Sequence, residues 1–269
     1  KKDKNFKIRS GPWKNMYLWD LYQKACTPFN WHKEAFKIAK KFNKKIFSSP
    51  FSIRAVDHLE KFKCPIYKIA SFELTDLKLI ERVAATRKPL LMSTGMATYD
   101  EISDAVKCAR INGAKEILLF HCISSYPAPI EQSNLKSIQS LKQKFGVEVG
   151  LSDHTLGPEI AISSINYGAS VIEKHITIKN NDGALDSKFA LDSSSMKHFV
   201  DAIKNKDISL VINTPMGEQS RYDEEGIGKA CIKHGILAIT TLSGANAVLR
   251  AIRAGEQIIT IKSIQEYHI

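Results

Sequence analysis

A repeating strand–helix unit constrains the fold of this 269-residue chain more than any other feature. Six short runs rich in β-branched and apolar residues, typical of strands, alternate with amphipathic stretches typical of helices, at spacings of about 21 to 31 residues. The predicted strands are 46–49, 67–71, 90–94, 117–121, 147–152 and 170–175, and the predicted helices between them are 53–62, 76–85, 99–111, 134–145 and 158–167. This order predicts an α/β fold with a parallel sheet and crossover helices, and the near-regular period favours a (β/α) TIM-type barrel over an open sheet.

Each predicted strand ends in polar or charged residues. Because the carboxyl ends of parallel strands face one side of a barrel, we expect these side chains to share the rim on which such enzymes build their sites. Serine and aspartate after a strand also cap helices, which suffices for Ser48, Asp76 or Asp100 taken singly. Capping explains poorly why a lysine, two glutamates and three histidines also occupy strand ends, namely Lys68, Glu73, His121, His154, Glu173 and His175.

His154 and His175 follow neighbouring predicted strands. Two imidazoles on one rim are a plausible pair of ligands for a divalent metal, with the other coordination positions open to water and substrate. Asp153, Glu173 and Asp186 add carboxylates that could orient the imidazoles or a bound water. A histidine at a strand end is also commonly an ordinary hydrogen-bonded group, so two histidines alone leave the metal hypothesis open.

Lys68, Ser71, Ser93 and Ser152 supply an ammonium group and three hydroxyls near predicted helix N-termini. This combination suits a phosphate or a carboxylate, because a positive charge, hydroxyl donors and helix-end N–H groups converge. The residues alone leave two alternatives for Lys68. One is the Schiff-base lysine of an aldolase, and the other is a structural salt bridge to Glu73.

The net charge of +11 is concentrated in the N-terminal part of the chain. Residues 1–47 hold 13 basic and 3 acidic residues, whereas the remaining 222 residues hold 26 and 25. A chain-wide attraction to nucleic acid is therefore not predicted. Aromatic residues interleave with the basic ones, and we expect them to pack a pair of helices whose lysines form a solvated face. They are Trp13, Tyr17, Trp19, Tyr22, Phe29 and Trp31.

Several classes of protein lack support in the sequence. The five cysteines are odd in number, widely spaced and without a Cys-x-x-Cys pair, which predicts a reducing, cytoplasmic location. No apolar run approaches the roughly 18 residues that a membrane-spanning helix needs. Motifs for nucleotide phosphates or a serine-hydrolase elbow are also missing from the sequence.

The run from Phe47 to about Leu191 resembles the catalytic barrel of the sialic acid synthase family, enzymes that condense phosphoenolpyruvate with an amino sugar. The motifs that carry the resemblance are 67–73 (YKIASFE), 92–97 (MSTGMA), 121–129 (HCISSYPAP), 150–155 (GLSDHT) and 172–175 (IEKH), in the family's order and separations. The form of residues 70–73, with 11–13 (GPW) and 27–32 (TPFNWH) upstream, is most similar to the pseudaminic acid synthase branch, and the resemblance extends over about 1–204.

The resemblance implies a role for each matching residue. It implies that Lys68, Ser71, Ser93 and Ser152 hold phosphoenolpyruvate, with Ser124 at a position where some members have asparagine, and that His154 and His175 hold manganese or magnesium. It also implies that Glu73, Tyr126, Glu173 and Asp186 contact the sugar or the catalytic water. The implied reaction gives a nonulosonic acid and phosphate. The implied partners are phosphoenolpyruvate and an amino sugar, with neither nucleic acid nor membrane.

The chain also departs from the family pattern. The family barrel begins with two further strand–helix units that carry a glutamate and a lysine of the site, so six strands are expected here where closure needs eight. The C-terminal antifreeze-like domain of the family is not expected within these 269 residues, and a homodimer is a possible assembly. The alternative function is a catalytically impaired anion-binding or regulatory module.

The C-terminal part, residues 205–269, is expected to be a separate domain. Its predicted elements are strands at 210–214 and 238–241, helices at 222–234 and 244–254, and a last apolar strand. Residues 207–269 resemble part of the methylglyoxal-synthase-like regulatory domain of carbamoyl-phosphate synthase, which implies an effector site at Asn213, Thr214 and Thr241. A second hypothesis is that the two tail strands complete the barrel, since six and two make eight.

Overall fold

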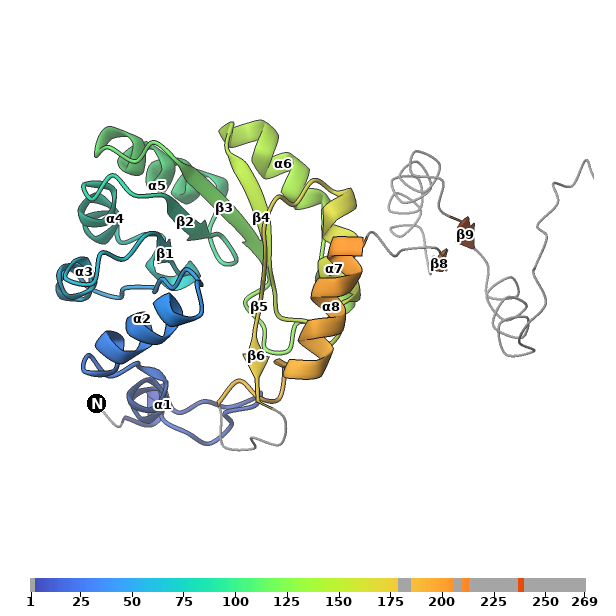
Figure 1. The fold of residues 1–269 in the computed structure, drawn as a ribbon, viewed down its shortest axis with the longest axis horizontal. Helices are drawn as coiled ribbons and strands as arrows, with labels where there is room; N and C mark the ends of the chain where they lie inside the picture. The colour runs from blue at the N-terminus through green and yellow to red at the C-terminus, as the bar shows by residue number, and fades with distance from the viewer. Residues whose placement is uncertain (1–2, 179–184, 206–209, 213–236, 240–269) are drawn as a thin grey trace, which may run out of the picture. The chain divides into compact units, whose positions relative to one another are not determined.

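The computed structural model describes residues 3–178, 185–205, 210–212 and 237–239. Contacts divide the chain into two compact units, Lys1–Val200 and Asp201–Ile269. The first unit contains the five-stranded sheet and the helices around it, labelled β1 to β5 and α1 to α7 in Figure 1. None of the helices among the described residues is both long enough and apolar enough to cross a bilayer.

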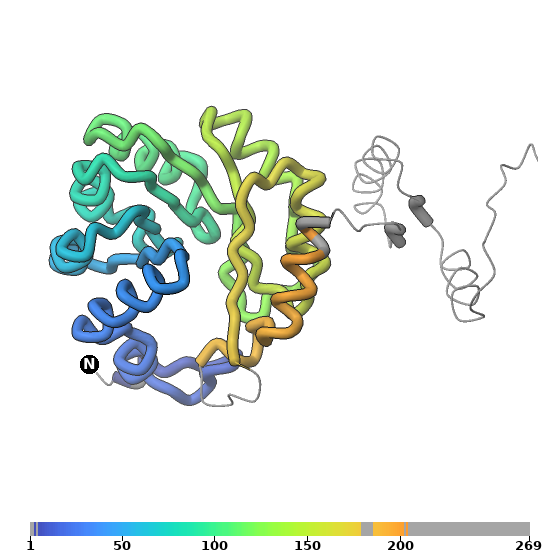
Figure 2. The backbone as a smooth tube through the Cα atoms, in the orientation of Figure 1, coloured from blue at the N-terminus to red at the C-terminus, as the bar shows by residue number. Residues whose placement is uncertain are grey.

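The sheet of the first unit is parallel, and its strands are adjacent in chain order. The strands are β1 (Tyr67–Ile69), β2 (Leu90–Ser93), β3 (Ile117–Cys122), β4 (Glu148–Asp153) and β5 (Ile172–Lys174). Each neighbouring pair is parallel, from β1 with β2 to β4 with β5. Helices lie along the outer side of this curved sheet, so the architecture is a parallel half-barrel of α/β type, as the smooth trace of Figure 2 also shows.

The helices α3 to α7 agree with the predicted ranges to within a few residues at their ends. They are α1 (Leu18–Ala25), α2 (Trp31–Lys41), α3 (Ile53–Glu60), α4 (Leu77–Ala84), α5 (Tyr99–Ile111), α6 (Lys136–Phe145), α7 (Glu159–Asn166) and α8 (Ser193–Asn205). A capping box of Thr98 and Glu101 begins α5, and Asp76 accepts a hydrogen bond from the N–H of Leu79 at the start of α4. A short parallel pair, β6 (Ile176–Thr177) with β7 (Leu191–Asp192), lies beyond β5.

The core lies between the sheet and its outer helices. Ile69 and Leu90 on the strands and Leu79, Ile80 and Val83 on α4 are fully or almost fully buried. Gly150 lets β4 approach β5 closely, because a Cβ at this position would lie 2.5 Å from the carbonyl oxygen of Val171. The backbone of the strand ends is therefore held against a close-packed layer.

The first predicted strand, residues 46–49, is not a strand in the structure. It contributes an isolated bridge of Ser48 with Tyr67, in which the N–H of Lys68 donates to the carbonyl of Ser48 at 3.4 Å. Pro50 follows directly and has no N–H to extend the ladder. The half-barrel therefore has five hydrogen-bonded strands.

The hypothesis that the tail strands complete the barrel is wrong. β8 (Leu210–Ile212) pairs in parallel with β9 (Leu237–Ile239), and the two form a separate two-stranded sheet. Among the described residues, these two strands pair only with each other. The predicted tail helices and last strand lie outside the described residues.

Candidate active site

A cavity of about 330 Å³ opens at the carboxyl ends of the five strands. The structure brings together at this cavity eight of the residues that the sequence singled out. They are Lys68, Ser71, Ser93, Tyr126, Ser152, His154, Glu173 and His175. Parallel strands deliver their polar ends to one rim, as the sequence pattern predicts.

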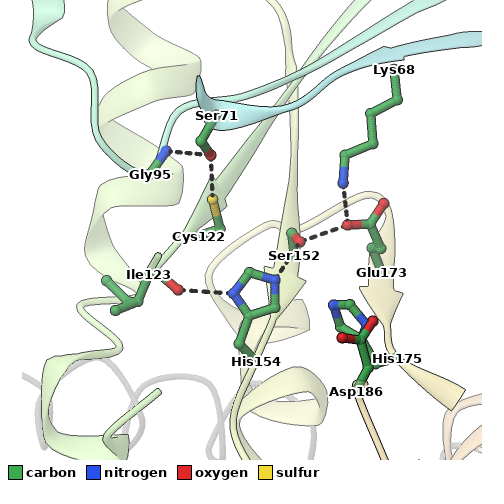
Figure 3. Close-up of polar contacts among 10 residues, drawn as sticks. All are labelled: Lys68, Ser71, Gly95, Cys122, Ile123, Ser152, His154, Glu173, His175 and Asp186. Atoms are coloured by element: carbon green, nitrogen blue, oxygen red, sulfur yellow. Dashed lines mark hydrogen bonds and ion pairs between the residues drawn. The ribbon is translucent and has the colours of Figure 1, made fainter. Parts of the chain in front are cut away.

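Glu173 connects the polar groups of this cavity. Lys68 Nζ forms an ion pair with Glu173 Oε1, and Ser152 Oγ donates to the same oxygen at 2.7 Å (Figure 3). Burial raises the pKa of Glu173, but the Lys68 charge and the hydrogen bonds from Lys68 and Ser152 outweigh it and hold the pKa below its usual range. Glu173 is therefore ionised at neutral pH. Because Lys68 pairs with Glu173, the alternative of a Lys68–Glu73 salt bridge is wrong.

His154 is held in one orientation beside this network. Its Nδ1 lies 2.8 Å from the carbonyl oxygen of Ile123, which can only accept, so Nδ1 carries the proton and Nε2 carries the lone pair. Nε2 lies 3.4 Å from Ser152 Oγ. Burial lowers the pKa of His154, so the ring is neutral at pH 7.

His175 lies next to His154, with the two ring centroids 5.4 Å apart. Its Nδ1 contacts Asp186 Oδ2 at 3.1 Å, so its Nε2 is the nitrogen left for a ligand. Within the described ranges no group of three or more histidine, cysteine, aspartate or glutamate side chains is arranged to hold a metal. Two imidazoles, each with Nδ1 engaged by an outer oxygen, nevertheless match the donor set of an open divalent-metal site.

Hydroxyl groups form the other wall of the cavity. Ser71 Oγ accepts from the N–H of Gly95 at 3.3 Å and lies 3.3 Å from Cys122 Sγ. A Cβ at Gly95 would lie 2.9 Å from the backbone oxygen of Cys122, so this approach requires glycine. Ser93 Oγ is buried and has no hydrogen-bond partner among the described residues. A buried hydroxyl without a partner, such as that of Ser93, can donate to an oxyanion in the cavity.

Tyr126 packs on the paired imidazoles. Its ring centroid lies 4.3 Å from that of His154 and 6.2 Å from that of His175. Burial raises the pKa of Tyr126 to about 12, so its phenol keeps its proton at neutral pH. Ser124 and Asp186 do not line the cavity itself. Ser124 lies beside Gly95, and Asp186 contacts His175.

Glu73 lies on the short 3-10 helix Ser71–Glu73 beside the cavity. Its Oε2 is buried without a hydrogen-bond partner among the described residues. Burial raises the pKa of Glu73 above the ordinary value of 4.5. The folded chain therefore holds the Glu73 proton more tightly than the unfolded chain does.

The Glu73→Gln variant is expected to gain stability at pH 7 relative to wild type and to differ little at pH 4. The pKa of Glu73 is higher in the folded chain than in the unfolded chain. Its contribution to stability is therefore full below the unfolded-state pKa and is lost as pH rises through the folded-state pKa, and glutamine avoids this loss. Melting temperatures at pH 4, 5 and 7 measure it. Glu148→Gln is the control, since the hydrogen bond from Lys142 lowers the pKa of Glu148; a Glu73→Gln gain equal at all three pH values would contradict the prediction.

The structure reveals contacts that the sequence pattern did not. Asp153 does not orient an imidazole: its Oδ2 binds Lys174 Nζ at 2.6 Å, and Lys174 also donates to the carbonyl of Thr155. The expectation that the N-terminal aromatic residues pack a helix pair is wrong for Trp13, which contacts the rings of Tyr126 and Phe189, and for the largely exposed Trp19 and Trp31. The proposed effector residues Asn213, Thr214 and Thr241 lie outside the described residues.

A parallel α/β half-barrel with a charged, hydroxyl-lined cavity at its strand ends defines a protein of the (β/α)-barrel class. Within that class, the chain belongs to the NeuB family, whose model matches residues 1–212.

Individual relatives agree with this family. The chain is 46% identical over 210 residues to the pseudaminic acid synthase of Helicobacter pylori, covering 78% of this chain and 62% of that protein. The chain thus spans about three fifths of the length of the curated relatives it matches. The crystal structure of the spore coat polysaccharide biosynthesis protein SpsE from Bacillus subtilis has a TM-score of 0.66 and 27% identity, covering 90% of this chain and 61% of that one. That of the N-acetylneuraminic acid synthetase from Leptospira borgpetersenii, solved with citrate, has a TM-score of 0.66 and 26% identity, covering 80% and 74%.

Proposed function

We propose that this chain takes part in the metal-dependent condensation of phosphoenolpyruvate with an N-acetylated amino sugar, giving a nonulosonic acid of the pseudaminic type and phosphate. The observation that carries the proposal is the cavity in which the Lys68–Glu173 pair stands beside two imidazoles with engaged Nδ1 atoms. Relatives named pseudaminic acid synthase support the choice of sugar branch. The enzyme class is therefore a phosphoenolpyruvate-dependent transferase.

Phosphoenolpyruvate is proposed to bind on the Lys68 side of the cavity. The Lys68 ammonium is mostly buried, and an anion that enters the cavity meets a charge with little competing water. Ser71, Ser93 and Ser152 line the same cavity. The Ser71 and Ser93 hydroxyls can donate to a phosphate or carboxylate oxygen, and Ser152 can do so by turning its O–H away from Glu173. Ser124, at the edge of this group, is proposed to lie near the same substrate.

His154 and His175 are proposed to hold the divalent ion, manganese or magnesium. When bound, such an ion supplies Lewis acidity that polarises the aldehyde of the open-chain sugar. The Ile123 carbonyl and the Asp186 carboxylate keep each imidazole in the tautomer that presents Nε2.

The remaining side chains are proposed to handle protons and orient the sugar. The reaction joins C3 of phosphoenolpyruvate to the sugar aldehyde carbon, and water then adds at C2 before phosphate leaves with carbon–oxygen cleavage. Glu173 is ionised and can accept the proton of that water, whereas Tyr126 keeps its proton and can donate to a sugar oxygen. Glu73 and Asp186 are proposed to contact the sugar or the water.

The test is release of inorganic phosphate from phosphoenolpyruvate with Mn²⁺ and a panel of diacetamido-trideoxy sugars. The proposal predicts release only when phosphoenolpyruvate, metal and sugar are all present. Phosphate release that does not depend on the sugar would contradict it. Phosphoenolpyruvate binding without any release would favour the anion-binding module instead.

The tail, residues 205–269, is proposed as a separate domain that binds an anionic effector. This proposal rests on the resemblance of residues 207–269 to the methylglyoxal-synthase-like domain. Titration with nucleotides and phosphates tests it, and binding that survives a Thr241→Ala change would contradict the effector site. We also propose that the chain forms a homodimer and that it acts in the cytoplasm, where phosphoenolpyruvate is made.

A further inference from the structure

Trp13 lies at the tip of an N-terminal loop that reaches the C-terminal end of the half-barrel. The loop is closed by a bridge between Lys7 and Tyr17 and by two backbone hydrogen bonds of 2.9 Å, from Ile8 N–H to Met16 and from Asn15 N–H to Ile8. From this loop the indole Nε1–H of Trp13 donates to the carbonyl oxygen of Leu185 at 3.1 Å. The two residues are 172 positions apart in the sequence, so this contact is a tertiary one.

The accepting carbonyl belongs to the segment that carries Asp186. In this segment the N–H groups of Phe189 and Ala190 donate to the carbonyl of Asp186, and the N–H of Leu191 donates to the carbonyl of His175 at 2.9 Å. The Asp186 carboxylate reaches back to His175 Nδ1 at 3.1 Å (Figure 3). The segment is thus fixed to His175 at one end and to Trp13 at the other.

Ring contacts join the same residues. The centroid of Trp13 lies 5.7 Å from that of Tyr126 and 6.0 Å from that of Phe189. Phe189 is 2% exposed and lies edge-on to His175 at 5.0 Å, while Tyr126 lies 4.3 Å from His154. Trp13 therefore covers the outer side of the rings that pack on both imidazoles.

We propose that Trp13 is a positioning residue for the imidazole pair, acting through the Leu185 carbonyl and Asp186 on His175 and through Tyr126 on His154. The ring contacts of Trp13 are with Tyr126 and Phe189 and not with an imidazole, and Trp13 does not line the cavity. Its hydrogen bond fixes the residue next to Asp186, and its ring limits how Tyr126 and Phe189 can move. The metal part of this inference rests on the proposed function, whereas the orientation of His175 does not.

Two variants separate the two contacts. Trp13→Phe keeps an aromatic ring and removes the indole N–H, and Trp13→Ala removes both. Trp19→Phe is the matched control, because Trp19 lies on the neighbouring α1 and is 54% exposed. All measurements use the full chain, with Mn²⁺ alone as the metal probe.

The first measurement is a long-range ¹H–¹⁵N spectrum of the metal-free chain labelled at histidine, at pH 8, with His175 assigned by a His175→Asn variant. Wild type and Trp19→Phe are expected to show His175 as the Nδ1–H tautomer, and Trp13→Phe is expected to show a mixture. The second is Mn²⁺ affinity by calorimetry. We expect it to fall about fivefold in Trp13→Phe, as for one lost hydrogen bond, and about tenfold in Trp13→Ala, as for a lost outer-shell partner.

The two measurements separate a failure of the Trp13 inference from a failure of the proposed function. If wild type fails to bind Mn²⁺, the metal assignment falls, and the His175 spectrum alone still decides the role of Trp13. A Trp13→Phe spectrum with His175 unchanged from wild type would overturn the inference, as would equal effects in Trp13→Phe and Trp19→Phe. A loss of melting temperature without a change at His175 would show a structural role only.

Discussion

Replacing His154 with alanine is expected to weaken Mn²⁺ binding by about 100-fold or more, since removing even an outer-shell partner costs roughly 10- to 100-fold. His154 offers one of the two imidazole Nε2 atoms at the cavity, and its orientation is set by the 2.8 Å contact of Nδ1 with Ile123. The ring is neutral at pH 7, so no proton has to leave before the metal binds. Calorimetric titration with Mn²⁺ measures the loss.

His121 provides the matched control for this variant. It is likewise buried at a strand end and burial lowers its pKa, but its Nε2 lies 2.7 Å from the carbonyl of Ser133 and the residue does not line the cavity. His121→Ala is expected to lower the melting temperature while leaving Mn²⁺ affinity within about twofold, because the Ser133 bond is structural. Equal losses of affinity in the two variants would contradict the assignment of the metal ligands.

Replacing Lys174 with methionine is expected to lower the free energy of unfolding by about 3–5 kcal/mol, as for one partner removed from a buried ion pair. The Lys174 and Asp153 side chains are 2% and 1% exposed, and their contact is 2.6 Å. The substitution leaves the Asp153 carboxylate buried without its cation. It also removes the hydrogen bond from Lys174 to the carbonyl of Thr155, which fixes the turn after His154. Urea denaturation measures the change.

An exposed ion pair of the same kind serves as the control. Lys142 and Glu148 are 47% and 57% exposed, and Lys142→Met is expected to change the free energy of unfolding by about 1 kcal/mol or less. The double variant Asp153→Asn with Lys174→Met is expected to recover part of the loss, because it leaves no unpaired buried charge. A double variant less stable than Lys174→Met alone would show that an uncompensated Asp153 charge is not the cause.

The arrangement of the site was predictable wherever it follows from strand polarity. Residues such as Lys68, Ser93 and His154 sit at strand ends in the sequence, and parallel pairing alone brings them to one rim. The paired strands also place Ser152 opposite Glu173 and Asp153 opposite Lys174 in register. Because side chains alternate along a strand, the first pair faces the cavity and the second forms the buried ion pair.

The sequence did not predict which residues pair with one another in the site, because that depends on tertiary contacts. Glu73 and Glu173 are chemically the same, and only the placement of β5 beside β4 brings Glu173 to Lys68. Trp13 carries a local pattern that suits a helix pair, yet its partner Leu185 comes from the far end of the half-barrel. The short run at 46–49 has the composition of a strand, but it forms a single bridge, and Pro50 has no N–H to extend the pairing beyond it.

Titration of the chain with phosphoenolpyruvate in the presence of Mn²⁺ tests the central claim most directly. Wild type is predicted to bind at one site, and Lys68→Met is predicted to weaken binding by about 10-fold or more, since a charge-assisted hydrogen bond to the anion is lost. Lys88→Met, which removes a lysine that pairs with Glu60 away from the cavity, is predicted to leave the affinity unchanged. Equal affinity in wild type and Lys68→Met, or no binding by wild type at millimolar phosphoenolpyruvate, would contradict the claim that this cavity is the phosphoenolpyruvate site.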